Sequence, residues 1–382
     1  MRILLIDQFG EMGGGQRCLL EAAMGFSERG WDVLAAVPAA GAFAQALEPY
    51  CKEIHALACG PFTTGRKTLF DALRFAWQLP LQAAAIARIV SRSHVDVIYA
   101  NGPRVVPAAA LARCGRPLIY HAHWMPPQPR AAGLARHALG WSRASAVAPS
   151  RLAASWLKEA VDPARIHTVY NGVQARALPL RAKARSAAFS VAVLGRISPE
   201  KGQLEFARAA RLVSERIQGL SFTICGAPLF GGQRYFEAVR AEARTSVRFQ
   251  DWTENVFSFL QTVDLLVVPS MIDHAPRVIL EAFAAGVPVL AFASGAIPEL
   301  IEHGQTGLLV HDRTPEALAQ AILAAAGQPD LLDEIARRAR ARWNERYTLS
   351  RFQSEICEAV EETLRRRHNR SPLKSAGASA PA

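Results

Sequence analysis

Cysteine is scarce and scattered in this chain of 382 residues. Its six cysteines include no Cys-x-x-Cys pair, so neither a redox motif nor a zinc site is predicted. Isolated cysteines of this kind are typical of reduced thiols in an intracellular protein.

A long uninterrupted hydrophobic run is also missing. The most apolar stretch extends from Val278 to Pro298, but Glu281 and Pro288 interrupt it, and a membrane-spanning helix needs a longer run. The N-terminal apolar segment is broken at Asp7 and is not a signal peptide. We therefore expect a cytoplasmic protein that at most binds peripherally to the inner face of the cytoplasmic membrane.

Acidic residues are outnumbered by basic ones, 33 to 44, which gives a formal net charge of +11. Such an excess favours nucleic acid, an anionic membrane or phosphorylated small molecules as partners. Nucleic-acid binding would need a basic stripe with stacking aromatic side chains, and the seven tryptophans are dispersed, so we expect no nucleic-acid partner. The other open explanation is arginine spread over solvated helix faces.

Short apolar runs alternate with amphipathic stretches along nearly the whole chain, which is typical of βαβ units and parallel sheets. The first unit consists of a strand at Arg2–Ile6, a glycine loop, a helix at Gln16–Arg29 and a strand at Trp31–Val37. The stretch Gln174–Ala188, rich in Ala and Arg, has no periodicity and is expected to be a linker. The pattern predicts an α/β protein with two doubly wound, Rossmann-like parallel-sheet domains.

We expect the domains at residues 1–175 and 189–346, a helix at 347–368 that returns to the first domain, and a disordered tail at 369–382. Further strands are expected at Val95–Tyr99, Leu118–His121, Ala146–Ala148, Ile166–Val169, Ser190–Leu194, Ser221–Cys225, Val247–Phe249, Asp264–Val268, Val287–Phe292 and Gly307–Val310. Ligands of doubly wound sheets bind beyond the carboxyl ends of the strands. The cleft between the domains is therefore the expected site of chemistry.

A loop in the second domain carries two cations, Arg196 and Lys201. A strand is expected to end at Gly195, and a helix to begin near Gln203. Two cations placed ahead of a helix N-terminus suit a diphosphate, because the helix adds unpaired N–H groups and partial positive charge. The alternative is an ordinary loop with solvated charges.

Two acidic residues lie near the start of a later helix. Asp273 is on the loop that follows the strand ending at Ser270, and Glu281 is about a turn and a half into the helix that begins at Pro276. Both carboxylates can face one pocket and accept hydrogen bonds from the hydroxyls of a sugar and a ribose. The small residues 294–296 precede another helix start, where backbone amides can approach a phosphate.

Taken in order, these motifs resemble the donor domain of the family-4 retaining glycosyltransferases of GT-B fold. The resemblance covers Val191 to Val310 well and the N-terminal half more weakly. It is carried by Gly195-Arg196, Lys201-Gly202, Pro269-Ser270, Asp273, Glu281-Ala282, Gly286-Val287-Pro288-Val289, Gly295, Pro298-Glu299, Gly304 and Gly307.

The resemblance implies roles for these residues. Arg196 and Lys201 would hold the donor diphosphate, and Asp273 would bind the transferred sugar. Glu281 would bind the ribose. The donor would also contact the segment made of Gly295, Ala296 and Ile297.

The chain departs from the family at the first acidic position, where the family usually has Glu. Asp273 keeps the carboxylate on a shorter side chain, with seven residues between it and Glu281, so the sugar stays open. Asp251 replaces another family glycine, and Ser294-Gly295-Ala296 lacks the second glycine of a family pair.

The N-terminal half carries weaker signals. Gly14 and Gly15, at a helix start, resemble the family's glycine loop beneath the donor, although a tight turn without a ligand would look the same. Asn101 and His123 occupy polar positions of the acceptor side. We expect His121 and His123 to point to opposite faces of their strand, with only one lining the cleft, and the resemblance favours His123.

No Asp-x-Asp pair occurs in the sequence. Glycosyltransferases that hold a diphosphate through a metal usually carry such a pair, and Arg196 and Lys201 can neutralise the charge instead. We therefore expect neither a metal nor a cofactor, and a nucleoside diphosphate sugar as the donor substrate.

The predicted function is retaining transfer of a sugar from a UDP- or GDP-linked donor to a hydroxyl acceptor, in bacterial polysaccharide or glycolipid synthesis. The alternatives are a sugar-nucleotide epimerase or phosphorylase on the same fold, or a non-enzymatic nucleotide- or nucleic-acid-binding module.

The acceptor is expected to be a saccharide or a membrane-anchored, lipid-linked saccharide. The segment Phe62–Val90 mixes basic and aromatic residues and could form a helix pair on an anionic membrane surface. The alternative is that these residues belong to the core of the acceptor domain.

Overall fold

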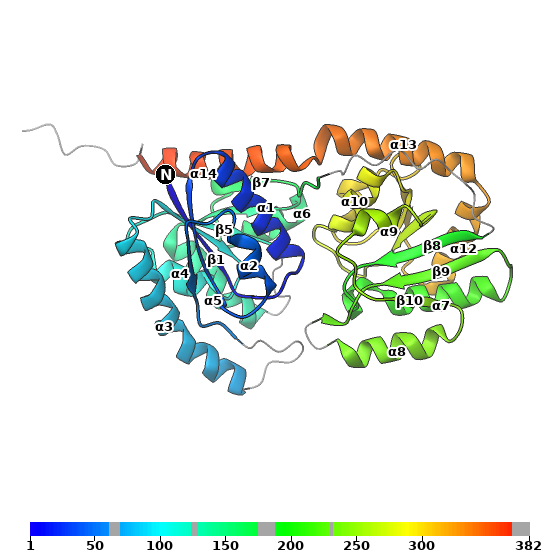
Figure 1. Ribbon diagram of the computed structural model, residues 1–382, viewed down its shortest axis with the longest axis horizontal. Coiled ribbons are helices and arrows are strands. Elements are labelled where there is room, and N and C mark those ends of the chain that lie inside the picture. Colours follow the sequence, from blue (N-terminus) through cyan, green and yellow to red (C-terminus); the bar gives the residue numbers. More distant parts are fainter. Residues whose placement is uncertain (61–68, 124–128, 175–187, 230–231, 369–382) are drawn as a thin grey trace, which may run out of the picture.

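The computed structural model describes residues 1–60, 69–123, 129–174, 188–229 and 232–368. These residues form two lobes, each built on a parallel sheet between layers of helices (Figure 1). The predicted pair of doubly wound α/β domains is confirmed. Most of the predicted linker and the whole of the predicted tail lie outside the described residues.

The first sheet has seven strands in the order β3-β2-β1-β4-β5-β6-β7, all paired in parallel. Its strands are β1 (Arg2–Asp7), β2 (Asp32–Val37), β3 (Glu53–Ala56), β4 (Val97–Asn101), β5 (Leu118–His121), β6 (Ser145–Ala148) and β7 (Ile166–Thr168). The inner strands are buried along nearly their whole length, because helices cover both faces of the sheet. The strand order reverses between β1 and β4.

Two layers of helices enclose this sheet. One face is covered by α3 (Leu69–Arg92), α4 (Val106–Ala112), α5 (Pro129–Ser142) and α6 (Arg151–Leu157). The other is covered by α1 (Gly14–Glu28), α2 (Ala42–Leu47) and α14 (Leu349–His368). A 3-10 turn, η1 (Pro163–Arg165), precedes β7.

The second sheet has six parallel strands in the order β10-β9-β8-β11-β12-β13. They are β8 (Phe189–Leu194), β9 (Leu220–Cys225), β10 (Arg248–Gln250), β11 (Leu265–Val268), β12 (Val289–Phe292) and β13 (Leu308–Val310). Here the order reverses between β8 and β11.

Helices also cover both faces of the second sheet. One layer contains α9 (Val256–Leu260), α10 (Arg277–Ala285), α11 (Ile297–Leu300) and α13 (Pro329–Arg346). The other contains α7 (Gln203–Ser214), α8 (Gln233–Ala243) and α12 (Pro315–Ala326). The 3-10 turn η2 (Pro199–Lys201) precedes α7.

The chain returns to the first domain at its end. The chain leaves the first domain at Val173, which pairs with Thr348 between α13 and α14. The Trp343 indole donates to the Val173 carbonyl at 3.3 Å. A side chain at Gly172 would come within 2.3 Å of the Thr348 carbonyl oxygen, so only glycine permits this close crossing. Beyond it, α14 buries Phe352 in the core around β1.

Most predicted elements are present with ends shifted by a few residues. The exceptions lie at the periphery: β3 was not predicted, because this edge strand is only partly buried and lacks an apolar run. The predicted helix pair at Phe62–Val90 is wrong for the described part, which is the single helix α3 with Pro80 inside it. Residues 62–68, including Arg66 and Lys67, lie outside the described residues.

None of the helices in the described part of the chain is long and apolar enough to cross a bilayer.

Candidate active site

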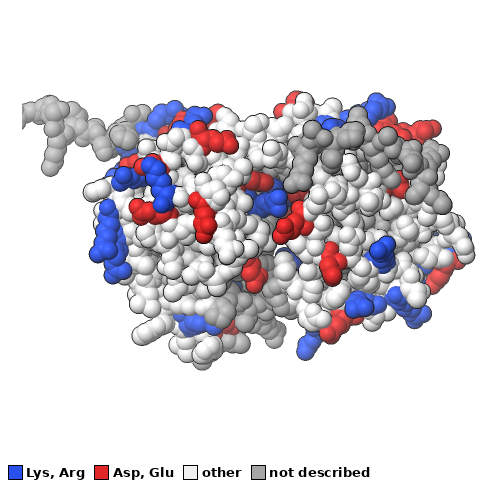
Figure 2. Space-filling view, viewed as in Figure 1, with Lys and Arg blue, Asp and Glu red and all other residues white. Residues whose placement is uncertain are grey.

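Polar residues of both domains lie at the strand ends where each sheet reverses its strand order. Asp7 ends β1 and faces Asn101, its register partner at the end of β4. In the second domain, Arg196 follows β8 and Ser270 follows β11. Loops at such a reversal point diverge and leave room for a ligand. Charged side chains of both signs gather along the seam between the lobes (Figure 2).

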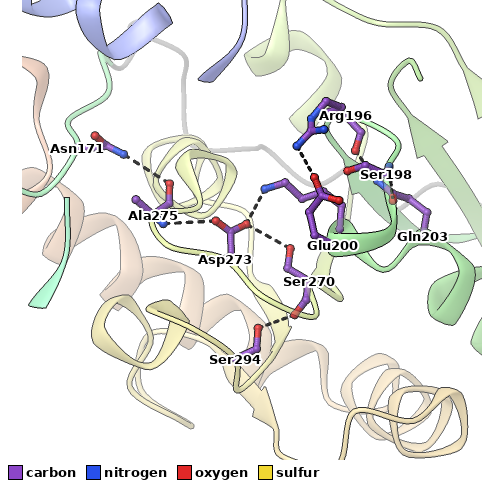
Figure 3. A network of polar contacts seen from close by, with 10 residues as sticks. Asn171, Arg196, Ser198, Glu200, Gln203, Ser270, Asp273, Ala275 and Ser294 are labelled. Carbon is purple, nitrogen blue, oxygen red and sulfur yellow. Dashed lines mark hydrogen bonds and ion pairs between the residues drawn. The ribbon is translucent and has the colours of Figure 1, made fainter. Parts of the chain in front are cut away.

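The loop after β8 holds Arg196 in place through its backbone. The buried Gln203 side chain donates to the Arg196 carbonyl at 2.8 Å and accepts from the Ser198 N–H at 3.3 Å. The Arg196 guanidinium pairs with Glu200 at 2.5 Å (Figure 3). This fixed loop presents a partly exposed cation beside the N-terminus of α7.

Lys201 and Asp273 contact each other. The Lys201 ammonium lies 2.6 Å from Asp273 Oδ2, and the Ser270 hydroxyl donates to the same oxygen at 3.3 Å (Figure 3). The Ser294 hydroxyl donates to the Ser270 carbonyl at 2.5 Å, which ties the loops after β11 and β12 together. The ammonium has three N–H donors, so it can hold Asp273 and still bind a phosphate oxygen.

The loop before α11 packs closely on the Asp273 backbone. Gly295 has a φ of +54°, and a side chain there would come within 2.0 Å of the Asp273 carbonyl oxygen. The Ala296 N–H donates to that oxygen at 2.8 Å, and Ile297 is buried behind it. The N–H of Ala296 is therefore engaged in the protein, and its contribution here is to position Asp273.

Glu281 lies one turn after Arg277 on α10. Burial raises the pKa of Glu281 above its ordinary value, and the positive charges of Arg277 and Arg17 oppose this rise. The carboxylate forms no hydrogen bond with another residue of the described ranges. It is therefore open to a ligand hydroxyl.

An ion pair joins the domains beside Glu281. Both carboxylate oxygens of Glu21, on α1, lie 2.7 Å from the guanidinium of Arg277, which also donates to the Cys18 sulfur at 3.3 Å. Both charged side chains are 11% exposed. Removing one partner of such a buried pair costs about 3–5 kcal/mol, because the other charge is left unpaired.

A second contact across the seam involves Glu299 on α11. Its carboxylate accepts from the N–H groups of Arg151 and Leu152, both at 2.8 Å, at the start of α6 in the first domain. The Tyr170 hydroxyl donates to it at 2.8 Å. Glu299 thus pairs with N–H groups at the N-terminus of α6, which have no partner within that helix. Its negative charge also interacts favourably with the positive end of the α6 dipole.

A buried polar chain forms the first domain's side of the site. Asp7 accepts from Gln16 at 3.1 Å and from Asn101 through a short hydrogen bond. The side-chain amide oxygen (Oδ1) of Asn101 accepts from His123 Nε2 at 2.6 Å. The His123 ring lies against Gly15, where a Cβ would be 3.2 Å from it. The arrangement brings Gly15, Asn101 and His123 together, with Gly14 opening α1 beside them.

The expectation that His121 and His123 point to opposite faces is wrong. Their ring centroids are 4.0 Å apart, because side chains two residues apart on an extended chain share one face. His121 is fully buried behind His123, and its Nδ1 is hydrogen-bonded to the Tyr99 hydroxyl at 2.8 Å. Burial lowers the pKa of both rings, and that of His123, which also faces Arg277, to about 3. Both histidines are therefore neutral near pH 7.

Sequence reasoning missed Asp7, the Arg277–Glu21 pair and the capping role of Glu299. A charged residue directly after an apolar strand was the available signal for Asp7. No local pattern relates Arg277 to Glu21, since they are 256 residues apart. Among the described side chains, no group of three or more His, Cys, Asp or Glu could hold a metal ion.

Two family models match the chain in succession. The model of glycosyltransferase family 4 matches residues 12–176, and that of glycosyl transferases group 1 matches residues 188–328. The chain belongs to this glycosyltransferase family. The enzyme is accordingly a glycosyltransferase of GT-B fold.

Curated relatives carry several activities. A D-inositol 3-phosphate glycosyltransferase of Actinosynnema mirum is 28% identical over 86% of this chain and 87% of its own length. Another of Streptomyces coelicolor is 35% identical, but the match covers 36% of this chain and 32% of the relative. An alpha-maltose-1-phosphate synthase of Mycolicibacterium smegmatis is 29% identical over 52% of this chain and 57% of its own length.

Solved structures share the whole fold. Anabaena HepE, solved with UDP and glucose, is 25% identical, with a TM-score of 0.79 over 94% of this chain and 99% of that one. Sucrose-phosphate synthase of Thermosynechococcus elongatus reaches the same TM-score at 18% identity, over 96% of this chain and 100% of that one. The latter likeness shows the fold alone.

The buried Asp7 predicts a pH-dependent stability of the glycosyltransferase. Burial raises the pKa of Asp7 to about 7, against the hydrogen bonds from Asn101, Phe9 and Gln16. The folded state thus binds the Asp7 proton more tightly than the unfolded state does. This proton's contribution to the free energy of unfolding is complete below about pH 4 and is lost as the pH rises to about 7.

Asp7→Asn, which imitates the neutral carboxyl, should remove that loss. Relative to the variant, the wild type should lose on the order of 3 kcal/mol of unfolding free energy between about pH 4 and pH 8. Denaturant titrations at several pH values measure the difference, with the surface substitution Asp330→Asn as the control. Parallel pH profiles of wild type and Asp7→Asn would contradict a raised pKa.

Proposed function

We propose that the enzyme transfers a sugar from a UDP- or GDP-linked donor to a hydroxyl acceptor and retains the anomeric configuration. The observation that carries the proposal is the cluster of Arg196, Lys201, Asp273 and Glu281 at the reversal point of the second sheet. Arg277, one turn before Glu281 on α10, contacts Glu21 on α1 of the first domain. A nucleoside diphosphate sugar has the charges and hydroxyls that these groups complement.

In this proposal the diphosphate binds Arg196 and Lys201. Departure of the nucleoside diphosphate concentrates negative charge on the leaving oxygen, and fixed cations stabilise that charge better in a partly water-excluded site than in water. The N-terminus of α1 at Gly14 and Gly15 supplies further N–H groups from the other domain. Both cations already have carboxylate partners, which hold them in place before the donor arrives.

The sugar and the ribose then take separate carboxylates. Asp273 is 8% exposed and is held by Lys201, and in this proposal it accepts from a hydroxyl of the transferred sugar beside the diphosphate. Glu281 would accept from the ribose hydroxyls. Anabaena HepE has been solved with UDP-glucose, which supports a nucleotide sugar as the donor.

The chemical step breaks the bond from the anomeric carbon to the phosphate oxygen and forms one to the acceptor oxygen on the same face. The acceptor proton passes to the departing phosphate. His123 is a poor base, because its pKa lies near 3. Its Nε2–H is used by Asn101, so Nδ1 can accept a hydrogen bond from a substrate hydroxyl.

The acceptor in this proposal is a saccharide or lipid-linked saccharide of bacterial cell-surface synthesis. One relative, from Mycobacterium tuberculosis, is a GDP-mannose-dependent phosphatidylinositol monomannoside mannosyltransferase that is 31% identical over 35% of this chain. The six unpaired cysteines support a reducing compartment, and we place the enzyme on the cytoplasmic side of the membrane.

Arg196→Ala and Lys201→Ala should each lower the transfer rate by on the order of 10²-fold, as the loss of one electrostatic donor to a transition state does. The measurement is kcat/KM with the donor selected from a panel of UDP- and GDP-sugars. Arg208→Ala, on the outer part of α7, is the matched control and should leave the rate unchanged. If both site variants keep wild-type kcat/KM, the phosphate assignment fails. Incubation with donor alone tests the epimerase alternative, since an epimerase needs no acceptor.

Asp273→Asn and Glu281→Ala should separate the two carboxylate roles. Asp273→Asn should reduce kcat while free nucleoside diphosphate still binds with nearly wild-type affinity. Glu281→Ala should weaken that binding by about tenfold, the effect of losing roughly one charged hydrogen bond. Calorimetric titration with UDP and GDP measures both affinities. The reverse pattern would exchange the two assignments.

Activity should persist in excess EDTA, because Arg196 and Lys201 supply fixed positive charge at the diphosphate. Rates are compared before and after chelation, and again after adding magnesium or manganese. Complete loss in EDTA with recovery on adding metal would overturn the proposal that no metal is needed.

A further inference from the structure

Large exposed hydrophobic side chains concentrate on one side of the first domain. Of twelve in the described residues, seven lie on α3, α4 and α5. They are Phe70, Leu73, Trp77, Leu81, Leu111, Leu134 and Trp141. These seven residues are called the three-helix face below.

The N-terminal half of α3 contributes a continuous stripe to this face. Phe70, Leu73, Trp77 and Leu81 follow one another at steps of three or four residues, which places them on one side of a helix. Trp77 is 74% exposed. The buried core residues of α3 are Ile86, Ile89 and Val90 in its C-terminal half, and Leu79 is partly buried against the same core. Most of the stripe therefore extends past the core of the domain.

The other two helices continue the same surface. α4 packs against α3, α5 packs against α4, and the inner sides of all three cover the same face of the first sheet. Their outer sides therefore form one surface. Leu134 and Trp141 lie two turns apart on the outer side of α5, and Leu111 lies between α3 and α5 on α4.

The segment of the chain that contains these three helices is also basic. Residues 61–143 contain eleven Arg or Lys residues and only two acidic residues, a net charge of +9, whereas the whole chain carries +11. Arg88 and Arg92 on α3 and Arg143, which directly follows α5, are exposed. The Arg74 guanidinium lies 5.6 Å from the ring centroid of Phe70, and also pairs with Asp71.

We propose that the three-helix face docks on an anionic phospholipid bilayer. An apolar surface that includes two tryptophans and is bordered by arginines matches the boundary between lipid tails and anionic headgroups. The excess positive charge complements the lipid charge and acts over about a Debye length, roughly 8 Å at physiological salt. A protein partner would have to be strongly acidic to match the same border.

This docking rests on the proposed function and specifies where the membrane would lie relative to the active site. The N-terminal end of α3 lies nearer to the second lobe than its C-terminal end (Figure 1). The bilayer would therefore lie at the edge of the first domain beside the seam. A lipid-linked acceptor could present its saccharide there while its lipid stays in the membrane.

The test is flotation of the purified full chain with vesicles of phosphatidylcholine alone or mixed with phosphatidylglycerol. The wild type should float with the mixed vesicles, weakly with phosphatidylcholine, and much less in about 1 M salt, where the Debye length falls to roughly 3 Å. Leu73→Gln/Trp77→Gln should lower the partition coefficient by about tenfold or more, because two buried side chains are lost from the lipid contact. Arg88→Gln/Arg92→Gln should flatten the salt dependence.

The matched control is Ile217→Gln/Leu331→Gln, which removes two exposed hydrophobic residues of the second domain and should float as the wild type does. Flotation of Leu73→Gln/Trp77→Gln at the wild-type level, or no flotation of the wild type with either vesicle, would overturn the proposal. A wild-type dimer in sedimentation that Leu73→Gln/Trp77→Gln converts to monomer would also overturn it, since the face would then bind a second copy.

Failure of this proposal is separable from failure of the proposed function. Stabilisation by UDP or GDP in a thermal melt, and transfer to a water-soluble acceptor, need no vesicles. Leu73→Gln/Trp77→Gln should keep both. Loss of lipid binding with intact nucleotide binding therefore tests the face alone.

Discussion

Parallel strand pairing is the constraint on which the site depends. In each sheet the first strand lies between two neighbours whose connecting helices pack on opposite faces, so the loops at its carboxyl end separate. One sheet places Asp7 and Asn101 there, and the other places Arg196 and Asp273. The ion pair between Arg277, at the start of α10, and Glu21 on α1 joins the helices that follow β11 and β1.

Polar contacts across the seam connect this arrangement to donor binding. Arg277 holds Glu21 of the first domain and lies one turn before Glu281, the proposed ribose ligand. Glu299 follows the Gly295 loop and caps α6 of the first domain. The same two segments that would contact the donor therefore also fix the other domain. A change in domain orientation has to break the ion pair between Arg277 and Glu21, whose side chains are 11% exposed, and the hydrogen bonds of Glu299.

The two halves of the site differ in their charge. The second domain presents permanent cations with carboxylates as partners, which suits the diphosphate. In the first domain burial favours neutral groups: it raises the pKa of Asp7 and lowers those of His121 and His123. In the proposed function, these neutral groups add little charge to compete with the electrostatic stabilisation of the leaving group. The His123–Asn101–Asp7 chain orients the imidazole through hydrogen bonds and not through charge.

The sequence alone determined the two-domain architecture, because hydrophobic periodicity and glycine positions are local properties. It also identified the cations and carboxylates near strand ends through an ordered set of motifs. It could not show that Lys201 and Asp273 are partners, that Glu299 caps a helix of the other domain, or that Arg277 meets Glu21. These pairs are separated by 72, 148 and 256 residues, and no periodic pattern relates them.

Only the tertiary structure decided the neutral state of His123 and the raised pKa of Asp7, because both follow from burial, which depends on how α1, β4 and β5 pack together. It likewise showed the exposure of Trp77 and Trp141, which the sequence could equally have assigned to the core.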